Sequence, residues 1–305
     1  MNKVLIIIIL ILVVIFSAFY LPKNPFSGKE ALFYIEKGQG SKEIALSLQE
    51  QGLIWWGPLF RVYTLLGGIS GNLQAGIYRL SPSISLADMA KKFSQGDVAK
   101  EKITIIEGWN LKNIAWHFEN KGMFQAEELF ELNDNSWQGG LEGYLFPDTY
   151  LVDYGVSLAE IIKQMQENFD KKTVGLAITP EIITMASLIE KEVRTLEDKK
   201  IVSGIFWKRM SAGRPLESCA TIAYVKGIDQ WRYSYEDTRI ESPYNTYLNL
   251  GLPVGPICNP GLESIKAALQ PKETDFWYWL STPEGQTIFS KTLEEHNYAK
   301  SIYLK

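Results

Sequence analysis

The N-terminal apolar run limits this chain most strongly. Residues 4–21 read VLIIIILILVVIFSAFYL, with Ser17 as the only clearly polar side chain. At about 1.5 Å per residue such a helix reaches roughly 27 Å, close to the ~30 Å hydrocarbon core of a bilayer. A cleaved signal peptide has a shorter apolar core that ends at small residues. Because Ser17–Tyr20 is a poor cleavage site, we expect an uncleaved transmembrane anchor.

The charges that flank this run say little about its orientation. Lys3 precedes it, and Lys23 and Lys29 follow it. The positive-inside rule therefore gives almost no indication of the orientation. Only two residues precede Lys3, so the bulk of the chain must lie on one side. A short tail with a single lysine stays inside easily. We therefore expect a single-pass protein with a cytoplasmic tip and its bulk outside.

Composition excludes several functional classes. Among 305 residues there are 31 basic and 35 acidic side chains, giving a net charge of −4, so the chain lacks the charge of a dedicated nucleic-acid binder. Two cysteines and two distant histidines, His117 and His296, cannot form a common structural zinc site or a disulfide scaffold. We expect neither a metal nor a cofactor.

The first half of the chain contains a recurring pattern after a linker at residues 22–28. A short alternating run, typical of a strand, is followed by a capped helix and a glycine. The copies are residues 32–35 with 40–52, residues 76–80 with 85–96, and residues 103–106 with 110–122. Because β–α units recur in many α+β folds, the pattern alone favours a structural role over a ligand-binding module.

A helix is expected after Thr179, which suits an N-cap and precedes Pro180. At 100° per residue, Glu190 and Glu192 fall on the two flanks of its buried stripe, about 160° apart. A half-buried glutamate would have a raised pKa and could act as a general acid. Solvated glutamates at the helix boundary are the simpler reading. The two side chains diverge too far to form a two-carboxylate glycosidase pair.

Residues 242–261 are dense in Pro, Gly, Asn, Thr and Tyr and almost uncharged. Polar groups among aromatic rings on a rigid backbone suit a neutral ligand such as a sugar. A well-packed loop explains the same composition equally well. The chain contains no P-loop, nucleophile elbow or HExxH motif.

Several motifs, taken in order, resemble the YceG-like endolytic murein transglycosylases, the MltG family. They are residues 142–150 (EGYLFPDTY), 186–192 (ASLIEKE), 242–247 (SPYNTY), 251–257 (GLPVGPI) and 259–261 (NPG), with Phe289-Ser290 and His296-Asn297. The resemblance covers roughly residues 29–305. It implies an α+β fold: an anchor at 1–21, a LysM-like β–α subdomain at 29–103 and a mixed α/β catalytic domain at 104–305.

The resemblance also implies an activity and its site. A membrane-anchored enzyme of the bacterial inner membrane would cut the β-1,4 MurNAc–GlcNAc bond of nascent peptidoglycan strands, form a 1,6-anhydroMurNAc end and terminate glycan elongation. Its partners would be glycan strands, the bilayer and peptidoglycan synthases. The catalytic acid would be Glu190. The candidates for sugar binding are Glu217, Thr221, Tyr244, Asn245, Thr246 and Asn297.

The chain departs from the family pattern at residues 216–221, LESCAT, where relatives often carry an LQTDPT-like run. If Glu217 faced the site, a second carboxylate would make hydrolysis conceivable. Cys219 and Cys258 both lie in site-bearing stretches and could pair outside the cell; two free thiols are the alternative. Two other functions stay open: a non-catalytic, membrane-tethered peptidoglycan-binding protein, and an assembly factor whose Pro/Gly-rich loop binds a protein.

Overall fold

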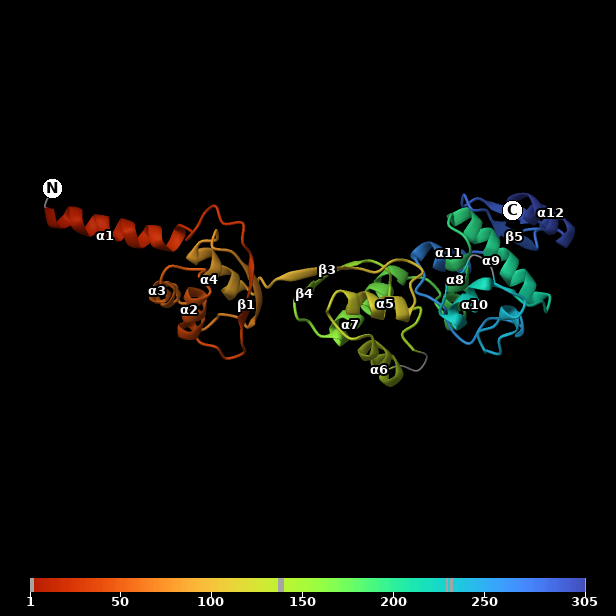
Figure 1. The fold of residues 1–305 in the computed structure, drawn as a ribbon, viewed down its shortest axis with the longest axis horizontal. Coiled ribbons are helices and arrows are strands. Elements are labelled where there is room, and N and C mark those ends of the chain that lie inside the picture. The colour runs from red at the N-terminus through yellow and green to blue at the C-terminus, as the bar shows by residue number, and fades with distance from the viewer. Residues whose placement is uncertain (1–2, 137–139, 229, 231–232, 305) are drawn as a thin grey trace. The chain divides into compact units, whose positions relative to one another are not determined.

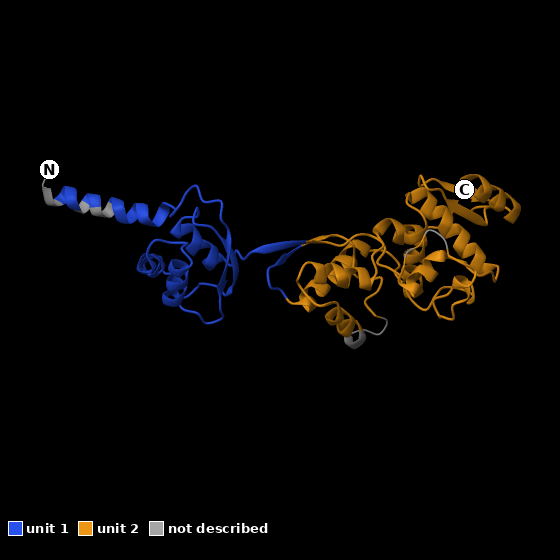
Figure 2. Ribbon diagram, in the orientation of Figure 1, with its two compact units in different colours: residues 1–102, 151–156 blue, residues 103–150, 157–305 orange. Residues whose placement is uncertain are grey.

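The computed structural model describes residues 3–136, 140–228, 230 and 233–304. It has a mixed α+β fold in which helices predominate and strands form two-stranded sheets, which confirms the α+β part of the expected fold. The chain divides into two compact units (Figure 2): unit 1 contains residues 1–102 and 151–156, and unit 2 contains residues 103–150 and 157–305.

Unit 1 is built on two strands and the helices that follow them (Figure 1). Its elements are α1 (Lys3–Tyr20), β1 (Ala31–Ile35), α2 (Ser41–Glu50), α3 (Gly57–Leu66), β2 (Gly76–Leu80) and α4 (Leu86–Gln95). β1 and β2 are antiparallel, with Ala31 opposite Leu80 and Ile35 opposite Gly76. Their inward side chains Phe33 and Tyr78 contact Phe93 of α4 in a closed aromatic core.

The expected β–α units are confirmed as secondary structure. Each of β1, β2 and β3 (Lys100–Thr104) precedes a helix, and the third helix is α5 (Leu111–Asn120). The glycines that end the units, Gly52, Gly96 and Gly122, all have a φ near +70°. Glycine adopts this left-handed conformation at no steric cost, and so stops each helix.

The N-terminal run is helical as α1, and Phe19 near its end packs on Tyr63 of α3. The side chains of residues 4, 8, 11 and 12 lie outside the described part of the structure. Within that part no helix is both long enough and apolar enough to cross a membrane. The residues expected as a linker are bonded into unit 1, for example through Asn24 N–H to the carbonyl of Pro82.

Unit 2 holds the remaining elements, and the chain passes between the units within β3 and within β4. In order they are α5, α6 (Ala126–Ser136), β4 (Thr149–Asp153), α7 (Leu158–Thr173), α8 (Pro180–Glu192), α9 (Leu196–Ser211), α10 (Cys219–Lys226), the 3₁₀ turn η1 (Asp237–Arg239), α11 (Leu262–Leu269), β5 (Tyr278–Ser281), β6 (Thr287–Ser290) and α12 (Leu293–Tyr303). β5 and β6 form an antiparallel hairpin.

Helix α8 lies in the middle of unit 2 and packs against α9, α10 and α11. It begins as expected, because the Thr179 side chain accepts a hydrogen bond from Ile182 N–H and Pro180 opens the first turn. The buried surface is wider than the expected apolar stripe, since Thr184 and Ser187 are also buried. A helix enclosed on most sides holds its last turn, with Glu190 and Glu192, in a fixed position.

Candidate active site

Three cavities follow the last turn of α8 in unit 2. Their volumes are ≈ 460, ≈ 380 and ≈ 290 Å³. Glu192 and Cys219 line both the first and the second, while Glu107 and Lys191 line both the first and the third. The three cavities therefore adjoin one another around the end of α8, and together they are called the groove below.

Glu190 lies at the edge of the groove with both carboxylate oxygens occupied. Lys199 Nζ of α9 lies 3.2 Å from Oε1, and Oε2 accepts from the N–H of Gly261 at 2.9 Å and the hydroxyl of Ser264 at 2.7 Å. The side chains of Lys199 and Glu190 are only 3% and 9% exposed. This buried ion pair fastens α8 to α9 and α11, and it leaves Glu190 little freedom to meet a substrate.

Glu192 lies on the other flank of the helix and has different partners. Ser218 donates to Oε1 at 2.5 Å, and Trp279 Nε1 donates to Oε2 at 3.3 Å. Both donors are neutral. Burial raises the pKa of Glu192, against the smaller lowering effects of these two bonds and of the Arg209 charge. A carboxyl that lines two cavities and has a pKa raised by burial is a candidate general acid.

Glu107 adds a third acidic group to the groove. Burial and the negative charge of Glu190 raise its pKa. Its carboxylate lies against Gly261, where an added Cβ would come within 2.0 Å of Oε1. The glycine of the Asn-Pro-Gly motif thus gives Glu107 room beside the groove.

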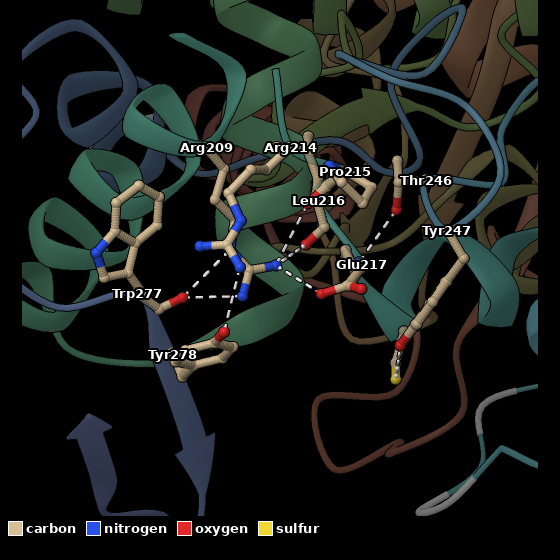
Figure 3. Close-up of polar contacts among 11 residues, drawn as sticks. Arg209, Arg214, Pro215, Leu216, Glu217, Thr246, Tyr247, Trp277 and Tyr278 are labelled. Atoms are coloured by element: carbon tan, nitrogen blue, oxygen red, sulfur yellow. Dashed lines mark hydrogen bonds and ion pairs between the residues drawn. The ribbon is translucent and has the colours of Figure 1, made fainter. Parts of the chain in front are cut away.

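Glu217 does face the groove, but as half of an ion pair (Figure 3). Its Oε2 lies 3.2 Å from Nη1 of Arg209. The same Nη1 donates to the carbonyl of Leu216, and Nη2 donates to the carbonyl of Trp277. Glu217 lines the second cavity with Glu192 and Arg209. The second carboxylate is thus present and neutralised by a buried guanidinium.

Four of the expected sugar-binding residues lie inside the fold and outside the three cavities. Thr221 and Thr246 share a hydrogen bond at 3.1 Å, and Thr246 Oγ1 accepts from Ser218 N–H at 3.0 Å. Asn245 donates to the carbonyls of Thr238 and Ile240, and the ring of Tyr244 packs on that of Tyr224. These side chains hold the loop that presents Glu217 and Ser218. Residues 242–261 thus act mainly as a packed loop.

On α12 the residue that lines the groove is His296, the neighbour of the predicted Asn297. Asn297 is exposed and lines none of the three cavities, whereas His296 is buried and lines the second. The His296 ring stacks on Tyr278 at 5.3 Å between centroids. Burial, with the nearby charges of Lys300 and Arg209, lowers its pKa to about 4, so the imidazole is neutral near pH 7. The motif match at 296–297 signalled this place but not which residue faces the groove.

The Glu-Gly-Tyr-Leu-Phe-Pro motif has a structural role. Glu142 is buried, and it accepts hydrogen bonds from Leu111 N–H and from the amide of Asn259. The side-chain oxygen Oδ1 of Asn259 accepts from the N–H groups of Gly143 and Leu145. These bonds join three chain segments that are far apart in sequence, and they place Glu107 and Gly261 beside α8.

The two cysteines are free, so the pairing of Cys219 with Cys258 is not formed. Cys258 is buried, with its thiol on the carbonyl of Ser187. Cys219 lies at the start of α10, and its sulfur is 3.0 Å from the hydroxyl of Tyr247. Each thiol is held by a separate polar partner, and only Cys219 lines the groove.

Comparison with known proteins gives consistent relatives. The chain is 33% identical to an endolytic murein transglycosylase of Bacillus subtilis over 88% of this chain and 84% of that protein. It is 29% identical to one of Streptococcus pneumoniae, over 91% of this chain but only 59% of that longer protein. A crystal structure of a YceG-like protein from Listeria monocytogenes, 30% identical, superposes with a TM-score of 0.60 over 90% of this chain and 100% of that one.

The family model described as YceG-like matches residues 33–301. That range contains almost all of unit 1 beyond its N-terminal helix, and nearly the whole of unit 2 with the groove. The resemblance noted from the motifs is thus confirmed, and the chain belongs to the YceG-like family.

Proposed function

We propose that this protein is a lytic transglycosylase of peptidoglycan. It cuts the β-1,4 bond between MurNAc and GlcNAc within nascent strands, leaves a 1,6-anhydroMurNAc end and so terminates glycan elongation. The observation that carries the proposal is a partly buried carboxyl, Glu192, whose pKa is raised by burial and which lines two adjoining cavities. The names of the relatives from Bacillus and Streptococcus support the same activity.

We assign the acid to Glu192 in preference to Glu190, the residue expected from the motif. Glu190 is bound to a buried lysine and two further donors. Glu192 has only neutral hydrogen-bond donors and opens onto two cavities. A general acid must carry a proton near neutral pH and must reach the leaving oxygen. Burial raises the pKa of Glu192, and its position beside two cavities makes it accessible to a substrate.

The reaction balances with this one carboxyl. Protonated Glu192 gives its proton to the glycosidic oxygen as the bond from that oxygen to C1 of MurNAc breaks. The resulting carboxylate then takes the proton of the 6-hydroxyl of the same MurNAc as O6 bonds to C1. Attack from within the ring gains from proximity. No water is consumed, and Glu192 ends protonated as it began.

Hydrolysis would need a second free carboxylate to activate water or attack the sugar. Glu217 shares the second cavity but is paired with Arg209, and Glu190 is paired with Lys199. Glu107 lines the first cavity, where burial and the charge of Glu190 raise its pKa. The pairing of Glu217 and Glu190 with cations favours transglycosylation over hydrolysis.

Mass spectrometry of products from uncrosslinked glycan strands tests the reaction. We expect anhydroMurNAc ends, whereas reducing ends would replace the proposal with hydrolysis. Glu192→Gln should lower kcat about 10²–10⁴-fold, the usual share of a general acid. Glu190→Gln, compared where both variants are folded, should lower it far less. The opposite ranking would return the acid to Glu190, and binding without cleavage by the wild type would indicate a non-catalytic cell-wall protein.

We further propose that the protein is anchored in the bacterial inner membrane by the apolar residues 4–21, with unit 2 outside the cytoplasm and peptidoglycan synthases among its partners. The composition of this run supports the anchor. The order β1–α2–α3–β2 of unit 1 supports a LysM-like module that binds glycan. Extraction of membranes at alkaline pH checks the anchor, because a peripheral protein would be released.

A further inference from the structure

We propose that Glu217 is a positioning residue that keeps Glu192 in its acid form by neutralising the buried charge of Arg209. The inference rests on the proposed function, because it concerns the protonation of the proposed acid. Glu217 itself need not touch the sugar. It acts through the guanidinium that shares the second cavity with Glu192.

The backbone at Glu217 indicates that its placement is costly and specific. Its φ is +54°, and no other non-glycine residue in the described part of the chain has a positive φ. A glutamate in this left-handed region is strained by about 1 kcal/mol or more. The strain is held by Glu217 N–H, which donates to the carbonyl of Thr246 at 3.1 Å, and by Ser218 N–H, which donates to Thr246 Oγ1.

This strained turn serves both groups at once. Glu217 turns its carboxylate to Arg209 at 3.2 Å, and the next residue, Ser218, donates its hydroxyl to Glu192 at 2.5 Å. A relaxed conformation at Glu217 would move one of the two side chains out of place. The turn therefore positions two groups together: the Glu217 carboxylate that pairs with Arg209, and the Ser218 hydroxyl that donates to Glu192.

The charge of Arg209 is held in a fixed position (Figure 3). Its side chain is 7% exposed and is fixed by hydrogen bonds to the carbonyls of Leu216 and Trp277. Alone, this cation would favour the carboxylate form of Glu192. The carboxylate of Glu217 is 48% exposed, but its contact with Nη1 of Arg209 at 3.2 Å offsets part of this charge.

The other groups around Glu192 contribute less. On the side of the first cavity they are Glu107, Glu190, Lys191, Arg194 and Tyr233, and on the side of the second Cys219, Tyr247, Tyr278, His296 and Lys300. Glu190 is neutralised by Lys199, and Lys191, Arg194 and Lys300 are exposed, where water screens their charge. Burial raises the pKa values of Glu107, Cys219 and Tyr247 and lowers that of His296, so Cys219, Tyr247 and His296 carry no charge near pH 7.

The test is the pH profile of kcat/KM for Glu217→Gln on uncrosslinked glycan strands. Glutamine has nearly the same shape and the same backbone demand at φ +54°, so the charge is the main change. Without that charge, Arg209 should move the alkaline limb of the profile about 0.5–1 pH unit lower. Activity above the limb should fall about three- to tenfold, and the loss should shrink toward acidic pH.

Glu197→Gln is the matched control. Glu197 on α9 is exposed, pairs with Lys200 at 3.2 Å and lies outside the groove, so its loss changes the net charge equally without moving the limb. Glu217→Gly is a second variant, because glycine relieves the strained φ, and it should shift the limb in the same direction. A limb that stays or rises in both folded variants overturns the inference, even where wild type yields anhydro ends. If the wild type yielded no anhydro ends, the proposed function itself would be overturned.

Discussion

The two flanks of the last turn of α8 place the same residue type in different surroundings. Glu190 faces the buried cation Lys199 and the donors of Gly261 and Ser264. Glu192 faces the neutral donors of Ser218 and Trp279. Both are partly buried, so burial alone does not separate their roles. The nearest partners do: the ion pair of Glu190 with Lys199 fastens helices together, whereas Glu192 has neutral donors and a pKa raised by burial.

The largest effect should come from breaking the ion pair on the Glu190 flank. Lys199→Met leaves a buried carboxylate without its cation, which costs about 3–5 kcal/mol of unfolding free energy. Denaturant unfolding of the variant measures this loss. Adding Glu190→Gln to Lys199→Met removes the uncompensated charge and should recover part of it. Equal stability of the single variant and the wild type would contradict a structural role for Glu190.

Glu142 extends the comparison to a carboxyl with neutral donors that is closed off from the groove. Burial raises its pKa to about 8. Because the folded state binds this proton more tightly than the unfolded chain, the stabilisation is complete below pH ~4.5 and is lost as pH rises through about 8. Wild type should lose about 2–4 kcal/mol of unfolding free energy across this window. Denaturation at several pH values measures the slope.

Glu142→Gln should flatten that pH profile, because the amide does not titrate. The exposed Glu197→Gln provides a control in which the slope is kept. An unchanged slope in Glu142→Gln would mean that another group controls the loss at alkaline pH.

Local sequence signals predicted much of the fold. The strand–helix–glycine units and the start of α8 at Thr179-Pro180 depend on contacts within a few residues, and these can be read from spacing and capping chemistry. The flank positions of Glu190 and Glu192 were also predicted by helical periodicity. Helical periodicity predicts which side chains are buried, however, and does not predict which residues they contact.

The roles within the site depend on contacts between distant residues. Glu192 meets Ser218 and Trp279, 26 and 87 residues away, and Glu190 meets Gly261, 71 residues away. No local pattern encodes these pairings. The composition of residues 242–261 likewise matched a sugar site and a packed loop equally, because buried amides and hydroxyls serve either. Asn245 donates to the carbonyls of Thr238 and Ile240, and Thr246 accepts from Ser218 N–H, so both side chains bond to neighbouring segments of the backbone.

The smallest effect should come from removing one neutral donor on each flank. Ser218→Ala deletes the hydroxyl that stabilises the charged form of Glu192 and lowers its pKa. Without it the alkaline limb of kcat/KM should move to higher pH by a few tenths of a unit, opposite to the shift expected for Glu217→Gln. The loss of stability should be about 0.5–1.5 kcal/mol.

Ser264→Ala is the matched change on the other flank, because it deletes a hydroxyl that donates to Glu190 at 2.7 Å. It should cost a similar amount of stability and leave the limb where it is, since the proposed acid is Glu192. If Ser264→Ala moved the limb and Ser218→Ala did not, the assignment of the two glutamates would be reversed. Opposite outcomes from the same atom deletion thus distinguish the proposed acid, Glu192, from the structural Glu190 without altering either carboxyl.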